Sequence, residues 1–384
     1  MSRPGSRKTR TTIGVVVAAL LLALVLWPPG GAQAQAGWQR TGFTVWADTL
    51  LTPKSGALFA RDAYGVYRSE DAGATWSRVS LPPAPPMKKR LQFDLDTTNH
   101  TIMYASGAEG VYRTTNDAST WTLVLPTDEI VASLAVSPAD TSVVYVGLMD
   151  QQGVVGNRFR LLKSQNGGAS WDTIEELGHG CANNVSRLMP DPTDPDRILR
   201  TAVCNPGGSL SVSLAESRDQ GNTWRALYDP PVGIPLRLVV GEGQQAGYLY
   251  LVVSRRTVDN DLVLRSEDNG ATWVETAAPW SALTLPPDVA EVWIEGLAAD
   301  PGQPGRVYVS LGAYARVEQQ RWSPRAAQVV MSEDGGRTWQ SLGWQEGTGG
   351  GVNVPGDVKV GIDGQNLYVA AGTGVWRLPL AGNR

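Results

Sequence analysis

An eight-residue motif that ends in tryptophan occurs six times along the chain. The first copy, residues 69–76, reads Ser-Glu-Asp-Ala-Gly-Ala-Thr-Trp, and the others end at Trp121, Trp171, Trp224, Trp273 and Trp339. Each copy lies between two short apolar runs, so the motif is predicted to be the turn of a β-hairpin. In such a turn Ser, Thr and Asp side chains bond nearby backbone N–H groups, Gly accepts a positive φ, and Trp supplies apolar area for packing between sheets.

The spacing of the motif predicts the architecture. Successive tryptophans are 45, 50, 53, 49 and 66 residues apart, and periods near 45–50 residues built from short strands are typical of propeller blades. A seventh unit is incomplete, because residues 374–377 match the strand that precedes a motif but no motif follows. Residues 37–40 resemble the strand that follows one. We therefore expect an all-β, seven-bladed β-propeller of four-stranded blades, with the last blade closed by the N-terminal strand.

The motif resembles the Asp-box, or bacterial neuraminidase repeat, whose pattern is Ser-x-Asp-x-Gly-x-Thr-Trp. Four copies are complete, and they supply Asp71, Asp219, Asp268 and Asp334 with Trp76, Trp224, Trp273 and Trp339. The two copies that end at Trp121 and Trp171 carry Asn where the pattern has Asp. Because the tryptophans occupy one equivalent position in every unit, the boxes are interpreted as structural.

Most of residues 37–384 resembles exported seven-bladed Asp-box propellers typified by photosystem II assembly and stability factors, and the shared motifs are those of the blade. That resemblance implies a non-enzymatic protein that binds partners through an arginine patch. The main functional prediction is therefore an exported protein-binding or assembly scaffold, acting through the loop face opposite the boxes.

Two other functions remain open, namely a carbohydrate-active hydrolase of sialidase-like or other glycosidase type, and a carbohydrate-binding module without catalysis. Sialidases share the boxes, but the Arg-Ile-Pro motif of that family does not occur in this sequence. A glycosidase uses paired carboxylates. Four candidates, Asp94, Asp96, Asp300 and Asp363, stand near the ends of predicted inner strands and are interpreted as turn residues. No catalytic residue is assigned.

Residues 1–36 have the form of a secretory signal peptide. Four Lys and Arg residues without an acid precede a 15-residue apolar run, residues 13–27, and two Ala-Gln-Ala sequences follow it. The run is shorter than the roughly 20 residues that a membrane-spanning helix needs, so cleavage is favoured over retention as an anchor. The protein is expected to be exported, with residues 37–384 forming a single, monomeric propeller.

The mature chain is acidic, since 29 Lys and Arg residues remain against 37 Asp and Glu residues, a formal net charge of −8. Such a chain is a poor general ligand of nucleic acid, and no nucleic-acid partner is expected. Two histidines, His100 and His179, offer little material for a metal site or a Ser-His-Asp triad. No metal or cofactor is predicted.

The two cysteines, Cys181 and Cys204, stand at the open end of a predicted hairpin in the fourth unit. The strands of this hairpin are residues 184–189 and 198–203, and a turn rich in Pro and Asp joins them. In an exported protein such a pair is expected to form a disulfide, which could add about 3 kcal/mol to the stability.

Function is expected on the face opposite the boxes, where the loops differ from blade to blade. Cations beside aromatic residues collect in these loops, and they suit a protein partner or an anionic or carbohydrate ligand. The predicted binding residues are Lys88, Lys89, Arg90, Arg158, Arg160, Arg255, Arg256, Tyr314, Arg316, Arg321, Trp322 and Arg325. Several belong to a predicted insertion at residues 311–326. Acidic residues are assigned to the same loops, so an ordinary solvated rim is the alternative.

Overall fold

The computed structural model describes residues 37–384 except for 63–64, 84–90, 151–158, 178–183, 205–210, 229–233, 242–246, 256–259, 318–320, 345–353, 362–363 and 381–384. Met1–Gln33 forms a unit separate from Ala34–Arg384, and the predicted signal peptide lies outside the described residues. Among the residues that are described, no helix is long and apolar enough to span a membrane.

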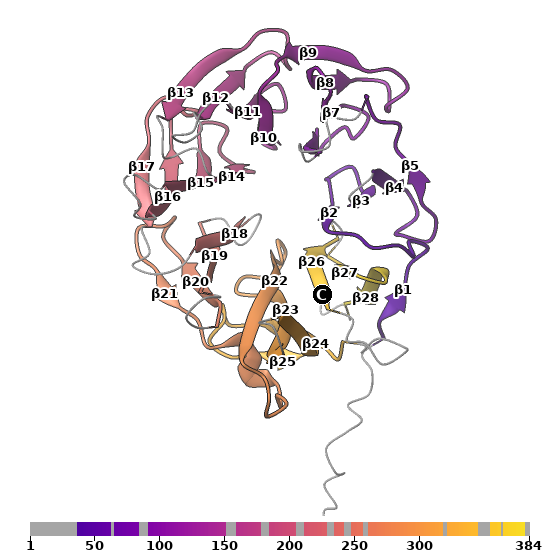
Figure 1. Cartoon of the computed structure of the whole chain (residues 1–384), viewed down its shortest axis with the longest axis vertical. Coiled ribbons are helices and arrows are strands. Elements are labelled where there is room, and N and C mark those ends of the chain that lie inside the picture. The colour runs from indigo at the N-terminus through magenta and orange to yellow at the C-terminus, as the bar shows by residue number, and fades with distance from the viewer. Residues whose placement is uncertain are drawn as a thin grey trace, which may run out of the picture. The chain divides into compact units, whose positions relative to one another are not determined.

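Seven antiparallel sheets of four strands each follow one another around a ring (Figure 1). The inner strands are β2 (Thr49–Leu51), β6 (Phe93–Leu95), β10 (Ile130–Val136), β14 (Asn184–Pro190), β18 (Ile234–Val240), β22 (Glu291–Ala299) and β26 (Pro355–Val360). The second strands are β3 (Leu58–Arg61), β7 (Met103–Gly107), β11 (Val144–Met149), β15 (Ile198–Cys204), β19 (Leu249–Ser254), β23 (Val307–Val317) and β27 (Asn366–Ala371).

The box turns connect the third strands to the outer strands in the first six blades. The third strands are β4 (Val66–Ser69), β8 (Gly110–Thr114), β12 (Phe159–Ser164), β16 (Ser211–Ser217), β20 (Leu262–Ser266), β24 (Arg321–Ser332) and β28 (Gly374–Pro379). The outer strands are β5 (Ser77–Arg78), β9 (Thr122–Pro126), β13 (Asp172–Leu177), β17 (Arg225–Tyr228), β21 (Val274–Glu275), β25 (Gln340–Ser341) and, in the seventh blade, β1 (Gln39–Arg40). The predicted all-β fold with seven four-stranded blades is confirmed.

The first box shows how the motif makes its turn. The Ser69 hydroxyl accepts a hydrogen bond from Gly73 N and donates one to Asp71 Oδ1, each at 2.8 Å. Asp71 also accepts from Thr75 N at 2.8 Å and from the Thr75 hydroxyl at 2.6 Å. Gly73 has a φ of 89°, where a Cβ would be strained and would meet the Thr41 side chain. The turn is held by its own side chains, so it can recur in blades whose other residues differ.

The tryptophans that end the boxes join neighbouring blades. The indole N–H of Trp121 donates to Ser80 O at 2.8 Å, just beyond the outer strand of the preceding blade. Equivalent bonds run from Trp171 to Val124 O, from Trp273 to Leu227 O and from Trp339 to Ala277 O. Trp76 instead donates to Gly73 O of its own box, so apolar packing between blades, which Trp76 and Trp224 also make, explains the recurring side chain better than the bond alone.

The seventh blade takes its outer strand from the other end of the sequence. Strand β1 pairs with β28, with Gln39 opposite Arg377 and Arg40 opposite Trp376. Trp38 precedes this strand and is 5% exposed. Its indole N–H donates to Leu342 O at 3.0 Å, and its ring packs edge-on against Trp344. Trp38 therefore makes the contact in this blade that box tryptophans make in others.

The prediction that residues 311–326 form an insertion of irregular structure is wrong. They continue strands β23 and β24, which stay paired as far as Val317 and Arg321. The reason is visible in the burial of β23, whose residues from Val307 to Ala315 are all buried. A strand buried on both faces lacks the polar alternation that identifies a half-exposed strand.

The predicted cysteine hairpin is present in part. Strands β14 and β15 pair antiparallel, and Cys204 is the last residue of β15. Cys181 lies outside the described residues, so the disulfide stays a prediction.

Candidate functional site

The structure separates the cations that the sequence analysis grouped. Lys88, Lys89, Arg90, Arg158 and Arg256 lie outside the described residues. Arg160 and Arg255 belong to blades three and five, whereas the other five predicted residues lie together on blade six.

Arg160 and Arg255 are bonded within their own surroundings. Arg160 Nη2 lies 2.6 Å from Glu129 Oε2, and the hydrogen bond to Glu129 raises the pKa of Arg160. Arg255 Nε donates to Asn260 O at 3.2 Å. Both guanidinium groups therefore have structural partners on the loop face.

Blade six carries a cluster of three aromatic rings, Trp293, Tyr314 and Trp322, which we call the aromatic cluster. Trp293 on β22 stacks on Tyr314 of β23 with ring centroids 4.0 Å apart, and Trp322 of β24 meets Trp293 edge-on at 5.4 Å. Tyr314 is 9% exposed, while the two tryptophans are half-buried. The rings thus pack together and still present part of their surface.

Two carboxylates hold the aromatic cluster in place. Tyr314 Oη donates to Glu295 Oε1 at 3.2 Å, and the indole N–H of Trp293 donates to Glu291 Oε2 at 2.9 Å. Glu291, Trp293 and Glu295 alternate along β22 with the buried residues Val292 and Ile294. Trp293 and Glu295 were not among the predicted site residues, although the alternation Glu-Val-Trp-Ile-Glu is the signal of a strand with one polar face.

Cations surround the aromatic cluster on the same hairpin. The guanidinium carbon of Arg316 lies 5.1 Å from the Trp322 ring centroid, a cation–π distance. Arg325 Nε lies 2.6 Å from Asp288 Oδ2, and this bond lowers the pKa of Asp288. Arg321 begins β24 and is exposed. Trp293, which comes from another strand, therefore connects Tyr314 to Trp322, and Arg316 contacts Trp322 directly.

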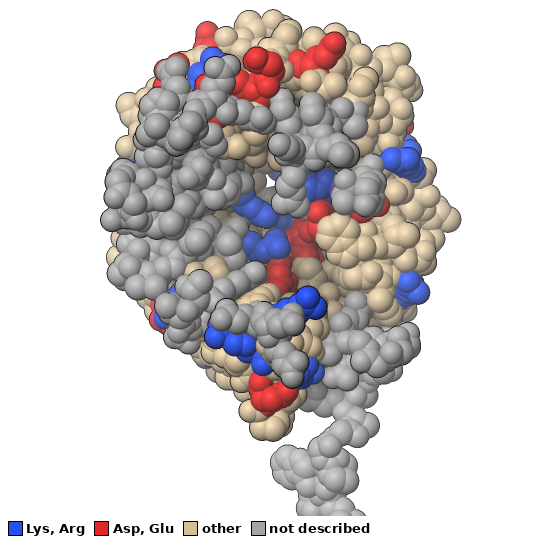
Figure 2. Space-filling model, in the orientation of Figure 1, with Lys and Arg blue, Asp and Glu red and all other residues tan. Residues whose placement is uncertain are grey.

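A second polar group lies in the central channel that the inner strands line. Its members are Arg187 of β14, Arg237 of β18, and Asp357 and Lys359 of β26, and we call them the channel cluster. Arg237 Nη1 lies 3.4 Å from Asp357 Oδ1, and Asp357 Oδ2 accepts from Leu50 N at 3.0 Å. Burial acts to raise the pKa of Asp357, but the charges of Lys359 and Arg237 outweigh it and leave that pKa lowered. Basic and acidic side chains lie together in the central hollow in Figure 2.

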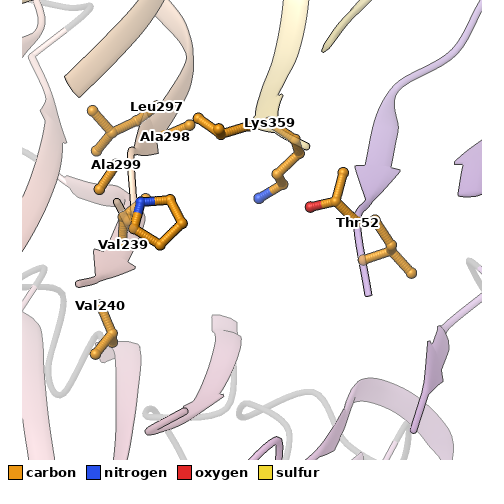
Figure 3. A pocket seen from close by; sticks show the side chains of 10 residues that line it. Thr52, Val239, Val240, Leu297, Ala298, Ala299 and Lys359 are labelled. Atoms are coloured by element: carbon orange, nitrogen blue, oxygen red, sulfur yellow. The ribbon is translucent and has the colours of Figure 1, made fainter. Parts of the chain in front are cut away.

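A cavity of about 220 Å³ adjoins the channel cluster at the ends of four inner strands. It is lined by Leu51, Thr52, Val239, Val240, Leu297, Ala298, Ala299, Pro301, Lys359 and Val360. In Figure 3 the amine of Lys359 points into the cavity, toward Thr52. The cavity lies at the ends of the inner strands nearer the boxes, whereas the aromatic cluster stands at the opposite ends.

Asp94 was predicted to be a turn residue, but its carboxylate bonds the backbone of two inner strands. Its carboxylate accepts hydrogen bonds from Val136 N of β10 at 2.8 Å and from Leu95 N at 2.9 Å. Burial raises the pKa of Asp94 to about 6, in spite of these bonds. Both oxygens are thus engaged by backbone.

Asp96 and Asp300 stabilise turns, as predicted, because they accept from Thr98 N and Gly302 N. Asp363 lies outside the described residues. Within the part of the chain that is described, no group of three His, Cys, Asp or Glu residues could hold a metal ion.

Comparisons with known proteins connect the chain to carbohydrate enzymes. No family model matches it, so the Asp-box assignment remains a resemblance of sequence. The xyloglucanase Xgh74A of Acetivibrio thermocellus is 28% identical over 152 residues, 36% of this chain and 17% of that protein. The GH74 enzyme of Niastella koreensis superposes with a TM-score of 0.61 at 20% identity, and the GH74 xyloglucanase of Xanthomonas campestris with 0.60 at 18%.

Each of these two structures is matched over 88% of this chain and 53% of its own, so the chain spans about half their length. An oligogalacturonate lyase of Vibrio parahaemolyticus superposes with a TM-score of 0.59 at 8% identity, over 91% of this chain and 95% of its own. These structures agree with the propeller fold. The main functional prediction from sequence, a non-enzymatic assembly scaffold, is wrong, because the curated relatives that match the chain are named xyloglucanases.

Proposed function

We propose that this protein is an exported carbohydrate-active hydrolase that binds a glycan on the loop face opposite the boxes. The observation that carries the proposal is the aromatic cluster with its two carboxylates, Glu291 and Glu295. The similarity to a xyloglucanase over 152 residues supports a β-glucan of the xyloglucan type as the substrate. Export rests on the form of residues 1–36.

The aromatic cluster suits sugar rings for a physical reason. A pyranose has an apolar face of C–H groups and a rim of hydroxyls, so it stacks on an aromatic ring while polar groups bond its edge. Trp293 and Tyr314 are already fixed by Glu291 and Glu295, and little side-chain entropy is lost when a sugar docks. Arg316 and Arg321 supply hydrogen-bond donors at the border.

The proposed chemistry is glycosidic hydrolysis with Glu291 and Glu295 as the acidic pair. Glycosidases generally place two carboxyl groups on either side of the bond that breaks, one to protonate the leaving oxygen and one to act as base or nucleophile. Both glutamates lie on the same face of β22, on either side of Trp293. A sugar stacked on Trp293 would therefore have an acid at each end.

The test measures release of reducing sugar by the purified protein from xyloglucan, mixed-linkage β-glucan and oligogalacturonides. We expect hydrolysis of a β-glucan, with Glu291→Gln and Glu295→Gln each lowering kcat at least about 100-fold. Glu275→Gln, an exposed glutamate on outer strand β21, is the matched control and should keep full activity.

Two outcomes would contradict this proposal, the first its hydrolase activity and the second its catalytic residues. Glycan binding without any hydrolysis would replace it with the non-catalytic carbohydrate-binding module. Wild-type kcat in both glutamine variants would show that the reaction takes place elsewhere in the protein.

A further inference from the structure

The channel cluster brings cations from three separate blades to one place. Arg187, Arg237 and Lys359 come from the inner strands of blades four, five and seven. The contact between Arg237 and Asp357 joins two blades that are not neighbours. These side chains therefore meet across the channel and not along one wall.

The channel cluster contains three cations and one carboxylate, so its net charge is positive. Burial lowers the pKa of Arg187, and repulsion from Arg237 lowers it further, with Asp357 as the compensating carboxylate. Arg187 is nevertheless partly exposed. Neighbouring cations that repel each other gain from a bound anion, because the anion offsets the repulsion.

Lys359 is the one member of the channel cluster that lines the adjoining cavity, and the cavity provides room for the rest of a ligand. Asp357 and Lys359 are two residues apart on β26 and so face the same side of the strand. Lys359 reaches into the cavity, whose walls are mostly aliphatic. At about 30 Å³ for each water in the liquid, the volume of about 220 Å³ accommodates a small molecule.

We propose that the central channel binds a small oxyanion, a phosphate or the carboxylate of a sugar acid, between the guanidinium groups of Arg187 and Arg237 and the amine of Lys359. A guanidinium presents paired N–H donors that match two oxygens of such a group. The site is independent of the proposed hydrolase, since none of its residues belongs to the aromatic cluster.

The test is calorimetric titration of the full protein with sodium phosphate and, separately, with sodium glucuronate at low ionic strength. We expect saturable binding of at least one of them, weakened by added salt. The tighter ligand identifies the source of the oxyanion. Arg187→Gln and Lys359→Met should each raise the dissociation constant at least tenfold, whereas Arg337→Gln, an exposed arginine on a box turn, should leave it unchanged.

Asp357→Asn provides a prediction of opposite sign, which loss of folding cannot imitate. Removal of this negative charge should tighten oxyanion binding several-fold, because the carboxylate no longer repels the anion. The fold should be kept, since the amide oxygen can still accept from Leu50 N. Absence of saturable binding up to about ten millimolar ligand, close to the millimolar limit of weak specific affinity, would overturn the proposal. Equal affinity in the wild type, Arg187→Gln and Lys359→Met would overturn it as well.

Discussion

The box turns and the extended β23–β24 hairpin are both hairpin ends in one propeller, yet they use polar side chains in different ways. In the box of Asp268, the carboxylate accepts from Thr272 N at 2.8 Å and from the Thr272 hydroxyl at 2.6 Å, the same bonds at the same distances as in the box of Asp71. On the extended hairpin, Tyr314 bonds Glu295 and Arg325 bonds Asp288, and each partner comes from another segment.

This difference indicates that the boxes serve stability and that the β23–β24 hairpin serves recognition. A box satisfies its polar groups locally and sends its tryptophan into the boundary with the preceding blade, so little is left for a ligand. The β23–β24 hairpin occurs once, and its Trp322 is half-buried, as is Trp293 of the neighbouring strand β22. Predictions that compare the same substitution in a box and in the hairpin are therefore the sharpest tests.

The largest effect is expected at the junction of the two chain ends. Trp38→Ala should lower the free energy of unfolding by about 3–5 kcal/mol, because it empties a buried aromatic site and removes the indole bond to Leu342. Deleting residues 37–42 should destabilise the protein further, since it exposes the edge of β28. Trp46→Ala, at a tryptophan that is 47% exposed, is the control and should melt near the wild type. Matching melting temperatures for the truncated and intact proteins would contradict closure of the ring by β1.

The second-largest effect on stability is expected from the disulfide. If Cys181 and Cys204 are joined, no thiol should react in the denatured, unreduced protein. Reduction should then cost about 3 kcal/mol of stability. Two reactive thiols would refute the pairing.

A pair of tryptophan variants tests the comparison directly. Trp273→Ala on a box should lower the free energy of unfolding by about 3 kcal/mol and leave the KM for glycan unchanged. Trp322→Ala on the hairpin should raise KM about tenfold, equivalent to roughly 1.4 kcal/mol of binding, with little loss of stability. Thermal melts and glycan kinetics on both proteins separate the two effects. An unaltered KM in Trp322→Ala would remove this ring from the binding surface.

The smallest effect concerns pH. Hydrogen bonds from Thr75 lower the pKa of Asp71 to about 2 from an ordinary value of 3.8, and the pKa values of Asp219, Asp268 and Asp334 are also lowered to about 2. The stability that these groups add is present above about pH 4 and is lost as the pH falls through 2. Replacing all four by Asn, the residue already present at Asn116 and Asn166, should flatten the fall in stability between pH 4 and pH 2. An unchanged slope would show that other carboxylates govern acid unfolding.

Much of the blade six site was within reach of the sequence, and the rest was not. Tyr314, Arg316 and Trp322 lie within nine residues of each other, so their proximity could be predicted from one segment. Trp293 joins them because β22 pairs with β23 in a register that depends on the bulge between Ile294 and Gly296. This pairing was not predicted, because residues 311–326 were predicted to be an insertion and not parts of two strands.

The number of blades and the position of every box followed from the sequence alone, because the motif makes its bonds within eight residues and repeats them. The channel cluster depended on the tertiary structure. Arg187, Arg237 and Asp357 lie far apart in the chain, and nothing local marks them as neighbours. They meet because β14, β18 and β26 line the same channel, and only the arrangement of the blades in a ring brings their side chains within electrostatic reach of one another.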